Sequence, residues 1–269
     1  MNSTNIINKI KKEIKINKKL LEEANKIDIK YDNKKIEFTK IFEIIDYFLK
    51  ISEGSISKTK VKEYVFIYYG DIYMTLYFAL VAILINKKIN LFMDEYLIGI
   101  NNVLLEIINS VLKENKLDLI NYSFGYKINE IKEIPDKEIF VIGNSTIYQE
   151  IYSLNNLRFI PFFNLIIYFD EHISQKKQEL LDIIFYYAEE NRFEFEVLDM
   201  DMEIEEIVEY SNKDIYSNII FVLTDDEKKK NILKTKIRKK KLYLNSNPFK
   251  IYENKVLECL NEMMKNIIK

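Results

Sequence analysis

The sequence predicts a doubly wound, Rossmann-like α/β fold with a parallel sheet, followed by a reduced second α/β unit. From about residue 61 onward, short apolar runs rich in β-branched and aromatic residues alternate with longer segments of helical periodicity. Helices between consecutive strands favour parallel pairing with right-handed crossovers. The chain has only five glycines, and Gly70, Gly125 and Gly143 each follow a strand-like run, where a turn is needed.

The first part of the chain predicts mainly helices. Residues 4–25 alternate lysine with isoleucine and leucine at helical spacing, which indicates an amphipathic helix. The stretch at 28–38 favours a short hairpin that turns at Asp32 and Asn33, and a helix over 39–52 follows. The segment SEGSISKTK (52–60) is a linker candidate, because it contains glycine and serines without apolar periodicity.

The remaining elements form two strand–helix series. The first series has strands at 61–69, 89–93, 117–124 and 138–143, with helices at 72–86, 103–115 and 145–154. The second has strands at 163–169, 193–199, 217–224 and 240–246, with helices at 175–191, 202–212, 225–237 and 253–268. We therefore predict an N-terminal segment (1–60), a Rossmann-like domain (61–162), a second α/β unit (163–247) and a C-terminal helix (248–269).

Composition excludes several classes of function. The formal net charge is −2, which gives no basic excess for nucleic-acid binding. A single cysteine, Cys259, excludes an internal disulfide and any multi-cysteine metal site. A single histidine, His172, disfavours most zinc sites, so no metal is expected. The longest apolar run, Ile72 to Ile85, is too short to span a bilayer and predicts a buried helix. No membrane association is expected, and the predicted location is cytoplasmic. The abundance of isoleucine, lysine and asparagine is typical of an AT-rich bacterium.

The stretch IFVIGNSTIYQEI (139–151) is the strongest candidate for a ligand-binding turn. Gly143, Asn144, Ser145 and Thr146 lie between a predicted strand and a predicted helix, where backbone N–H groups can face a phosphate or a nicotinamide. The alternative is an ordinary helix cap, with Asn144 or Ser145 as the capping residue. The sequence leaves both interpretations open.

Other polar residues at strand ends have two interpretations as well. Asp71 follows Gly70 and precedes the apolar helix, so it either positions a substrate or caps that helix. Asp94 and Glu95 end a strand, where acidic side chains bind ribose hydroxyls in dinucleotide folds or simply face solvent. The charge runs KKQELLDIIFYY and KIRKKKLY predict solvated faces.

Four stretches in order resemble the aldehyde dehydrogenase superfamily over about residues 61–247. They are YYGDIYMTLYFALVAILINKKINLFMDE, LLEIINSVLKENKLDLINYSFG, EIFVIGNSTIYQEI and EIEEIVEYSNKDIYSNIIFVLTDDEKKKNILKTKIRKKKLYLNS. The resemblance implies NAD or NADP as the cofactor. The residues that it places at the cofactor site are Tyr69, Gly70, Asp71, Gly125, Gly143, Asn144, Ser145 and Thr146.

The departures from the family pattern affect the catalytic positions. The ribose-binding lysine falls on Met93, and the catalytic asparagine falls on Gly70 or Asp71. The general-base segment falls on RFIPFF (158–163), which has neither glutamate nor glycine, and the nucleophile should lie near AEENR (188–192), which has no cysteine. Cys259 lies in the apolar pattern VLECLNEMM, which predicts a core residue. No catalytic residue is therefore assigned.

Three hypotheses about function follow. The protein is a shortened, non-catalytic relative that binds a partner protein or a nucleotide; this is the favoured hypothesis. Alternatively, it is an NAD(P)-dependent aldehyde or acyl oxidoreductase, or a structural subunit that forms an oligomer with itself or with an active homologue. If the cofactor groove is degenerate, we expect bulky residues such as Tyr69, Phe162 and Phe163 to fill part of it.

Overall fold

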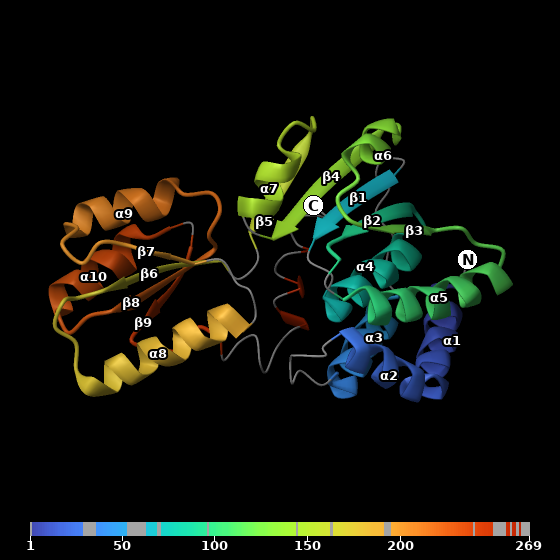
Figure 1. Ribbon diagram of the computed structural model, residues 1–269, viewed down its shortest axis with the longest axis horizontal. Coiled ribbons are helices and arrows are strands. Elements are labelled where there is room, and N and C mark those ends of the chain that lie inside the picture. Colours follow the sequence, from blue (N-terminus) through green and yellow to red (C-terminus); the bar gives the residue numbers. More distant parts are fainter. Residues whose placement is uncertain are drawn as a thin grey trace. The chain divides into compact units, whose positions relative to one another are not determined.

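The computed structural model forms two compact units (Figure 1). The first comprises Met1–Val141, Ile151–Arg158 and Val256–Lys269, and the second comprises Ile142–Glu150 and Phe159–Lys255. The structure describes residues 2–28, 36–52, 63–68, 71–95, 97–143, 145–161, 164–190, 195–238, 240–249, 257–258, 260–261 and 264. Most of the predicted linker, the turn at Asp32 and Asn33, and Cys259 lie outside these residues. The predicted division of the chain into four segments stays a prediction.

The first unit contains a five-stranded sheet with the order β3-β2-β1-β4-β5. Strands β1, β2 and β3 are parallel, with Tyr68 opposite Met93 and Met93 opposite Phe124 at their carboxyl ends. The chain thus builds outward from β1 in one direction and returns to add β4 on its other side. This is the doubly wound arrangement that the sequence predicts. The strands are β1 (Glu63–Tyr68), β2 (Lys88–Met93), β3 (Ile120–Phe124), β4 (Lys137–Gly143) and β5 (Leu157–Pro161).

Aromatic side chains connect the middle of this sheet to the helix that follows β1. Phe66 of β1 stacks on Phe78 of α4 (Ile72–Ile85) with ring centroids 4.5 Å apart, and on Phe140 of β4 at 5.6 Å. Phe66 and Phe78 are both almost completely buried. Aromatic pairs at these distances add to the stabilisation from buried area. These contacts place the centre of the first core between β1, β4 and α4.

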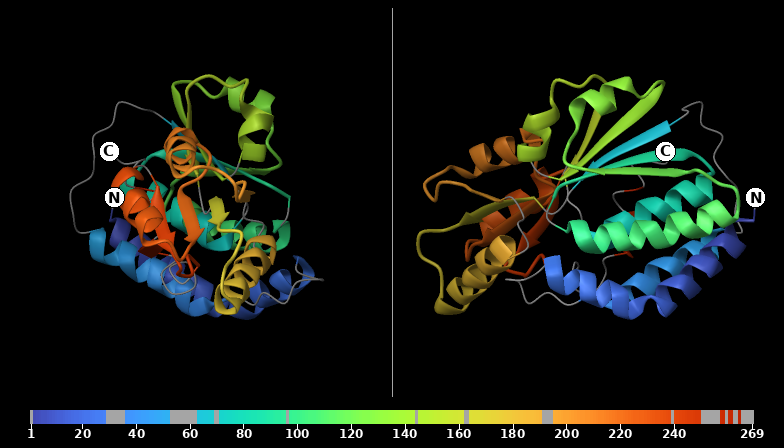
Figure 2. Two further views of the ribbon diagram at one scale, coloured as in Figure 1. Left: turned by 90° about the vertical axis from the view of Figure 1, so that its left-hand side faces the viewer. Right: turned by 45° about the vertical axis from the view of Figure 1, so that its right-hand side comes forward.

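Helix α4 is apolar on all sides because helices cover the side that faces away from the sheet. The covering helices α1 (Ser3–Ile16) and α3 (Phe38–Ile51) contact α4, while α1 and α2 (Lys18–Asp28) contact α5 (Ile98–Glu114). Figure 2 shows α1 to α3, in blue, as a layer beneath α4 and α5. Near the other end of the chain, buried Leu260 and Met264 belong to the same unit, and Tyr77 donates a hydrogen bond of 2.5 Å to Asn261 Oδ1.

Helix α5 receives its N-terminal cap from a distant residue. Leu97, at the N-cap position, offers no side-chain acceptor. Instead, the Asp28 carboxylate accepts hydrogen bonds from the backbone N–H groups of Gly99 at 3.0 Å and Ile100 at 2.7 Å. A Cβ atom on Gly99 would lie 2.8 Å from Asp28 Oδ1, so residue 99 must be small for the carboxylate to approach. Asp28 thus joins the end of α2 to the start of α5.

We expect Asp28→Ala to lower the free energy of unfolding by about 1–2 kcal/mol, the usual cost of removing a helix cap together with its favourable charge. Urea denaturation followed by circular dichroism measures this change. Asp28→Asn retains an acceptor and should lose less. If the alanine variant is as stable as the parent protein, the capping interaction does not stabilise α5.

Two elements of the first unit have no counterpart in the sequence prediction. Helix α6 (Ile128–Glu133) has only six residues, too few for helical periodicity to be evident. Strand β5 ends at a proline and lies at the edge of the sheet, where a residue without an N–H is tolerated. The other predicted elements that fall on described residues agree in type, except that the predicted helix over 4–25 is divided into α1 and α2. Asp28 and Phe38, the end residues of the predicted hairpin, belong to α2 and α3, and residues 29–35 lie outside the described part of the chain.

The second unit has a four-stranded sheet with the order β7-β6-β8-β9, in which β6 pairs in parallel with β7 and β8, and β8 with β9. Its strands are β6 (Leu165–Phe169), β7 (Phe195–Val197), β8 (Ile219–Leu223) and β9 (Lys241–Leu244). Its helices are α7 (Ser145–Ile151), α8 (Gln175–Glu190), α9 (Ile204–Lys213) and α10 (Glu227–Lys236). Ile166 and Tyr168 pack with Ile207 of α9 and Leu233 of α10. Figure 1 shows α8 on the opposite face of the sheet.

A buried ion pair stabilises the connections around β8 and β9. Lys240 Nζ lies 2.8 Å from Asp214 Oδ2, and the two side chains are 2% and 9% exposed. The same ammonium donates to the carbonyl oxygens of Asp214 and Ser217, while the carboxylate accepts from the N–H groups of Tyr216 and Ser217. The prediction that KIRKKKLY is a solvated face is therefore wrong for Lys240. Burial is compensated because every donor and acceptor of the pair is engaged.

Candidate functional site

The carboxyl edge of the first sheet carries two of the predicted site residues. Asp71 is the N-cap of α4, and its carboxylate accepts from the backbone N–H groups of Tyr73 at 2.8 Å and Met74 at 3.0 Å. These contacts agree with the interpretation of Asp71 as a helix cap. A carboxylate here also offsets the positive end of the helix dipole.

A buried polar chain lies directly behind this cap. The Tyr68 hydroxyl donates to Thr75 Oγ1 at 2.9 Å, and Thr75 Oγ1 lies 3.0 Å from the Asp71 carbonyl oxygen and 3.6 Å from Met93 Sδ. Tyr68, Thr75 and Met93 are all fully buried. Burial raises the pKa of Tyr68 above its ordinary value, so this hydroxyl is protonated. Met93, the residue on which the sequence resemblance places the family's lysine, is thus buried and packed against Thr75.

Gly125 follows β3 and approaches the end of β2. Its backbone N–H donates to the Met93 carbonyl oxygen at 2.7 Å, and its φ of +79° lies in the region that favours glycine. A Cβ atom at this position would lie 3.4 Å from Glu95 Oε1. The exposed Glu95 side chain and Gly125 are thus neighbours at the carboxyl ends of β2 and β3. Asp94, the residue before Glu95, donates its N–H to the Tyr68 carbonyl oxygen at 3.4 Å.

The remaining predicted residues belong to the second unit or lie outside the described part of the chain. Gly143 ends β4, and α7 begins with Ser145 and Thr146. The Gly143 carbonyl oxygen accepts a hydrogen bond of 3.0 Å from the Asn164 amide, which also donates to the Tyr216 carbonyl oxygen at 2.8 Å. Predictions on Tyr69, Gly70, Asn144, Phe162 and Phe163 fall on residues that the structure does not describe.

Aromatic contacts hold α7 within the second unit. The rings of Tyr148, Phe159 and Tyr216 contact one another edge to face, with centroids between 5.2 and 5.9 Å apart. Phe159, which lies in the segment where the sequence resemblance places the family's general base, has its ring packed against Tyr148 and Tyr216. Arg158, beside it, forms an ion pair with Glu138. Ala188, near the expected nucleophile, is fully buried.

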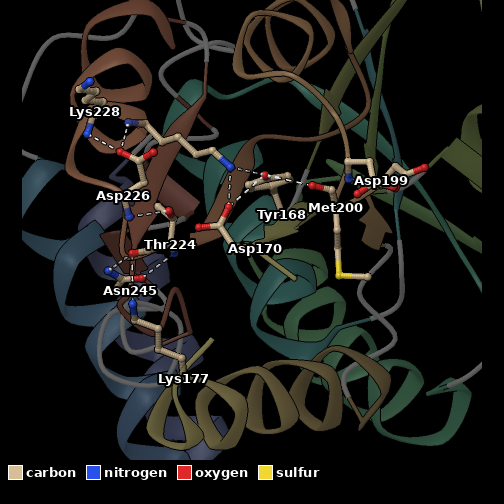
Figure 3. Close-up of polar contacts among 11 residues, drawn as sticks. Tyr168, Asp170, Lys177, Asp199, Met200, Thr224, Asp226, Lys228 and Asn245 are labelled. Atoms are coloured by element: carbon tan, nitrogen blue, oxygen red, sulfur yellow. Dashed lines mark hydrogen bonds and ion pairs between the residues drawn. The ribbon is translucent and has the colours of Figure 1, made fainter. Parts of the chain in front are cut away.

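A polar network that the sequence did not predict lies at the carboxyl ends of the strands in the second sheet (Figure 3). Asp170 follows β6, Thr224 follows β8 and Asn245 follows β9. Thr224 and Asn245 are joined by two hydrogen bonds, from Thr224 N to Asn245 Oδ1 at 3.1 Å and from Asn245 Nδ2 to the Thr224 carbonyl oxygen at 2.9 Å. Lys177 of α8 also contacts that carbonyl oxygen, at 3.2 Å, and its side chain is only 13% exposed. The prediction of a solvated face is thus wrong for Lys177 too.

Lys229 of α10 completes this network. Its ammonium lies 2.7 Å from Asp170 Oδ1 and 3.0 Å from the Tyr168 hydroxyl, which itself donates to Asp170 at 3.1 Å. Burial alone would raise the pKa of Asp170, but hydrogen bonds from Lys229, Thr224 and Tyr168 outweigh it, and the pKa is lowered. Burial likewise opposes the charge on Lys229, yet Asp170 and Tyr168 raise its pKa, and burial raises the pKa of Tyr168.

These directions determine what the network can do. Near neutral pH the carboxyl group is ionised, the lysine is charged and the tyrosine is neutral, so none of the three exchanges a proton readily. The network therefore stabilises the strand ends and α10. A general acid or base would need a pKa near the working pH.

We expect Lys229→Met to lower the free energy of unfolding by about 1–2 kcal/mol at pH 7, because it removes a charge-assisted hydrogen bond to Asp170. The folded-state pKa of Asp170 is depressed, so its contribution is complete above about pH 4 and is lost as the pH falls through the folded value. The difference between the variant and the parent protein should therefore narrow in acid. Urea denaturation midpoints between pH 3 and pH 7 measure this difference in stability. Lys228→Met, a substitution of an exposed lysine, is the control. A difference that is independent of pH would contradict the assignment.

The comparisons with known proteins identify the fold. No protein family model and no curated protein sequence matches this chain. Among solved structures, it is similar to glyceraldehyde-3-phosphate dehydrogenase GapN from Methanocaldococcus jannaschii in complex with NADP, with a TM-score of 0.60 and 12% identity over 91% of this chain and 81% of that one. It is also similar to AldH of Staphylococcus aureus in a substrate-bound state, with a TM-score of 0.58 and 10% identity over 93% of this chain and 81% of that one.

The 1-pyrroline-5-carboxylate dehydrogenase from Thermus with bound NAD gives a TM-score of 0.55 and 8% identity, over 91% of this chain and 73% of that one. These identities are low, so the likeness concerns the arrangement of helices and strands. Because the strand order of the first unit and the sequence stretches agree with it, the protein has the fold of the aldehyde dehydrogenase superfamily.

Proposed function

We propose that the protein is a non-catalytic relative of the aldehyde dehydrogenases that acts by binding an adenine nucleotide at the carboxyl edge of its five-stranded sheet. The observation that carries the proposal is the use of the family's chemical positions for structure. Met93 is buried against Thr75, and Asp71 caps α4. A residue engaged in this way is not available for ribose binding or for stabilising an oxyanion.

The strand order favours a ligand at this edge. In doubly wound sheets, ligands bind outside the carboxyl ends of the strands, where the order of winding reverses, and here that point is between β1 and β4. Acidic Asp94 and Glu95 end β2, and carboxylates at that position accept hydrogen bonds from ribose hydroxyls. They would repel a 2′-phosphate. We therefore expect NAD to bind more tightly than NADP.

Calorimetric titration of the full chain with NAD, NADP, ATP and coenzyme A tests the proposal. We expect binding of NAD, and a rise in melting temperature as its concentration increases, since a ligand at 100 times its Kd stabilises the folded state by about 2.7 kcal/mol. Glu95→Ala should weaken NAD binding, whereas the exposed Glu114→Ala, at the far end of α5, should not.

A parallel assay tests the absence of catalysis. The full chain is incubated with an aldehyde and NAD or NADP, and formation of the reduced cofactor is followed by absorbance. We expect no turnover above the background without protein. Turnover that Cys259→Ala abolishes would overturn the non-catalytic assignment, and absence of any nucleotide binding would overturn the ligand assignment.

A second function, binding of a partner protein, has one observation in its favour. Ile183 and Tyr186 are three residues apart on α8 and are 45% and 62% exposed. Apolar side chains on one exposed face of a helix are typical of an interaction surface. Light scattering of the purified protein, and of the double variant Ile183→Ser/Tyr186→Ser, distinguishes an oligomer that uses this face from a monomer.

A further inference from the structure

A cleft of about 400 Å³ lies at the amino ends of β4 and β5 in the first unit. One wall is the connection from α6 to β4, and the other is the connection from α7 to β5. The apolar part of its lining comprises Ile134, Ile139 and Leu154, of which the last two are buried. Ligand sites of small molecules begin at about this volume and combine an apolar surface with a few polar groups. The cleft is at the opposite end of the strands from the proposed nucleotide site.

Three polar side chains lie on the rim of the cleft. Lys132, Ser153 and Asn155 line it and are exposed. Within the described part of the chain, the Lys132 ammonium forms no ion pair, in contrast to Lys127, which pairs with Glu130 at 3.4 Å. Lys132 and Ser153 also line a second cleft of about 610 Å³, whose other lining residues are Tyr126 to Glu130 at the start of α6. They therefore lie where the two clefts meet.

The charges around the smaller cleft favour an anion. It is lined by two ammonium groups, from Lys132 and Lys137, and one carboxylate, from Asp136. Lys137 Nζ is held by the carbonyl oxygens of Lys132 at 3.0 Å and Ile134 at 2.8 Å, so its position is fixed. The hydroxyl of Ser153 and the amide of Asn155 supply neutral donors. A carboxylate accepts hydrogen bonds from all of these group types.

From the apolar lining, the excess of positive charge and the free donors, we infer that this cleft is a binding site for a short-chain aliphatic carboxylate. The carboxylate group contacts Lys132 and Ser153, and the aliphatic chain lies on Ile134, Ile139 and Leu154. This site is independent of the proposed nucleotide-binding function, because none of its residues belongs to the carboxyl edge of the sheet.

Titration of the full chain with acetate, butanoate and hexanoate, followed by saturation-transfer NMR and calorimetry, tests the inference. Each methylene group that enters the apolar part of the cleft should tighten binding roughly threefold to fourfold. Lys132→Ala should weaken hexanoate binding at least fivefold, and Ser153→Phe, which fills the cleft and keeps its charge, should abolish it. The exposed Lys113→Ala on α5 is the matched control and should bind as the parent protein does.

Several outcomes would overturn the inference. Hexylammonium binding as tightly as hexanoate would show that charge does not select the ligand, and inorganic phosphate binding as tightly would show that the apolar lining does not. The inference would also be overturned if the parent protein and Lys132→Ala bound hexanoate equally, or if no carboxylate bound at all. The affinity for NAD should be unchanged in Lys132→Ala. Loss of the carboxylate inference would therefore appear in the hexanoate titration, and loss of the nucleotide proposal in the NAD titration.

Discussion

Asp214→Ala is expected to lower the free energy of unfolding by about 3–5 kcal/mol, since it leaves the Lys240 ammonium buried without its counter-ion. The substitution also removes the acceptor for the N–H groups of Tyr216 and Ser217. Because total stability is typically about 5–15 kcal/mol, a loss of this size should populate unfolded protein at moderate temperature. Urea denaturation at pH 7 gives the magnitude.

Two matched variants separate charge from geometry. The double variant Asp214→Ala/Lys240→Met removes both charges and should be more stable than Asp214→Ala alone. Glu209→Ala, which removes a solvent-exposed ion pair with Lys213, should leave the stability almost unchanged. A loss under 1 kcal/mol for Asp214→Ala would mean that water reaches Lys240.

The same pair has a defined pH dependence. Burial would raise the pKa of Asp214, but Lys240 and two backbone N–H groups outweigh it and lower the pKa. For a carboxyl group with a depressed folded-state pKa, the stabilisation is complete above the unfolded value of about 3.9 and disappears as the pH falls through the folded value. The parent protein and Asp214→Ala should therefore approach each other in stability only in strong acid.

Phe66→Ala is expected to cost about 3–5 kcal/mol, because it creates a cavity where three aromatic rings meet. Phe66 is 1% exposed and contacts Phe78 and Phe140 from two different elements. Because Phe66 lies in the sheet and packs against α4, the cavity would lie between two packed layers, which cannot close together fully. Thermal or urea denaturation measures the loss.

Phe66→Leu keeps most of the volume and should lose much less than the alanine variant. Tyr152→Ala provides the surface control, because Tyr152 is 72% exposed and its removal leaves no internal cavity. If Phe66→Ala and Tyr152→Ala have the same effect, the core of the first unit is not centred on the aromatic stack.

The strands buried on both faces were the most predictable elements. Five strands begin and end within two residues of their predicted bounds: β1, β2, β4, β6 and β8. A short continuous apolar run is typical of a strand that is buried on both faces of a parallel sheet. The turn at Gly125 was predictable for a different reason, because glycine after a strand favours a turn with a positive φ.

The interactions that depend on distant residues were not predictable. Asp28 caps a helix 70 residues further along the chain, and local sequence gives no sign of this. Lys177 and Lys240 lie in charge runs, so the pattern predicted solvent, yet carbonyl and carboxylate oxygens from other segments surround them. The polar network at Asp170 and Lys229 was missed because strand pairing and the packing of α10 bring together residues that are far apart in the sequence. Polar residues directly after buried strands were the available signal.

The contact between Tyr77 and Asn261 has a consequence for synthesis. These residues are 184 positions apart, and Leu260 and Met264 pack into the unit that also contains α1. During synthesis on the ribosome, the core of the first unit is therefore completed only after residues 159–255 and the segment that follows them have emerged. Contacts of such long sequence separation slow folding. Until that segment emerges, the surface of the first unit that Leu260 and Met264 later cover stays open, and it is a part of the nascent chain that chaperones would be expected to bind.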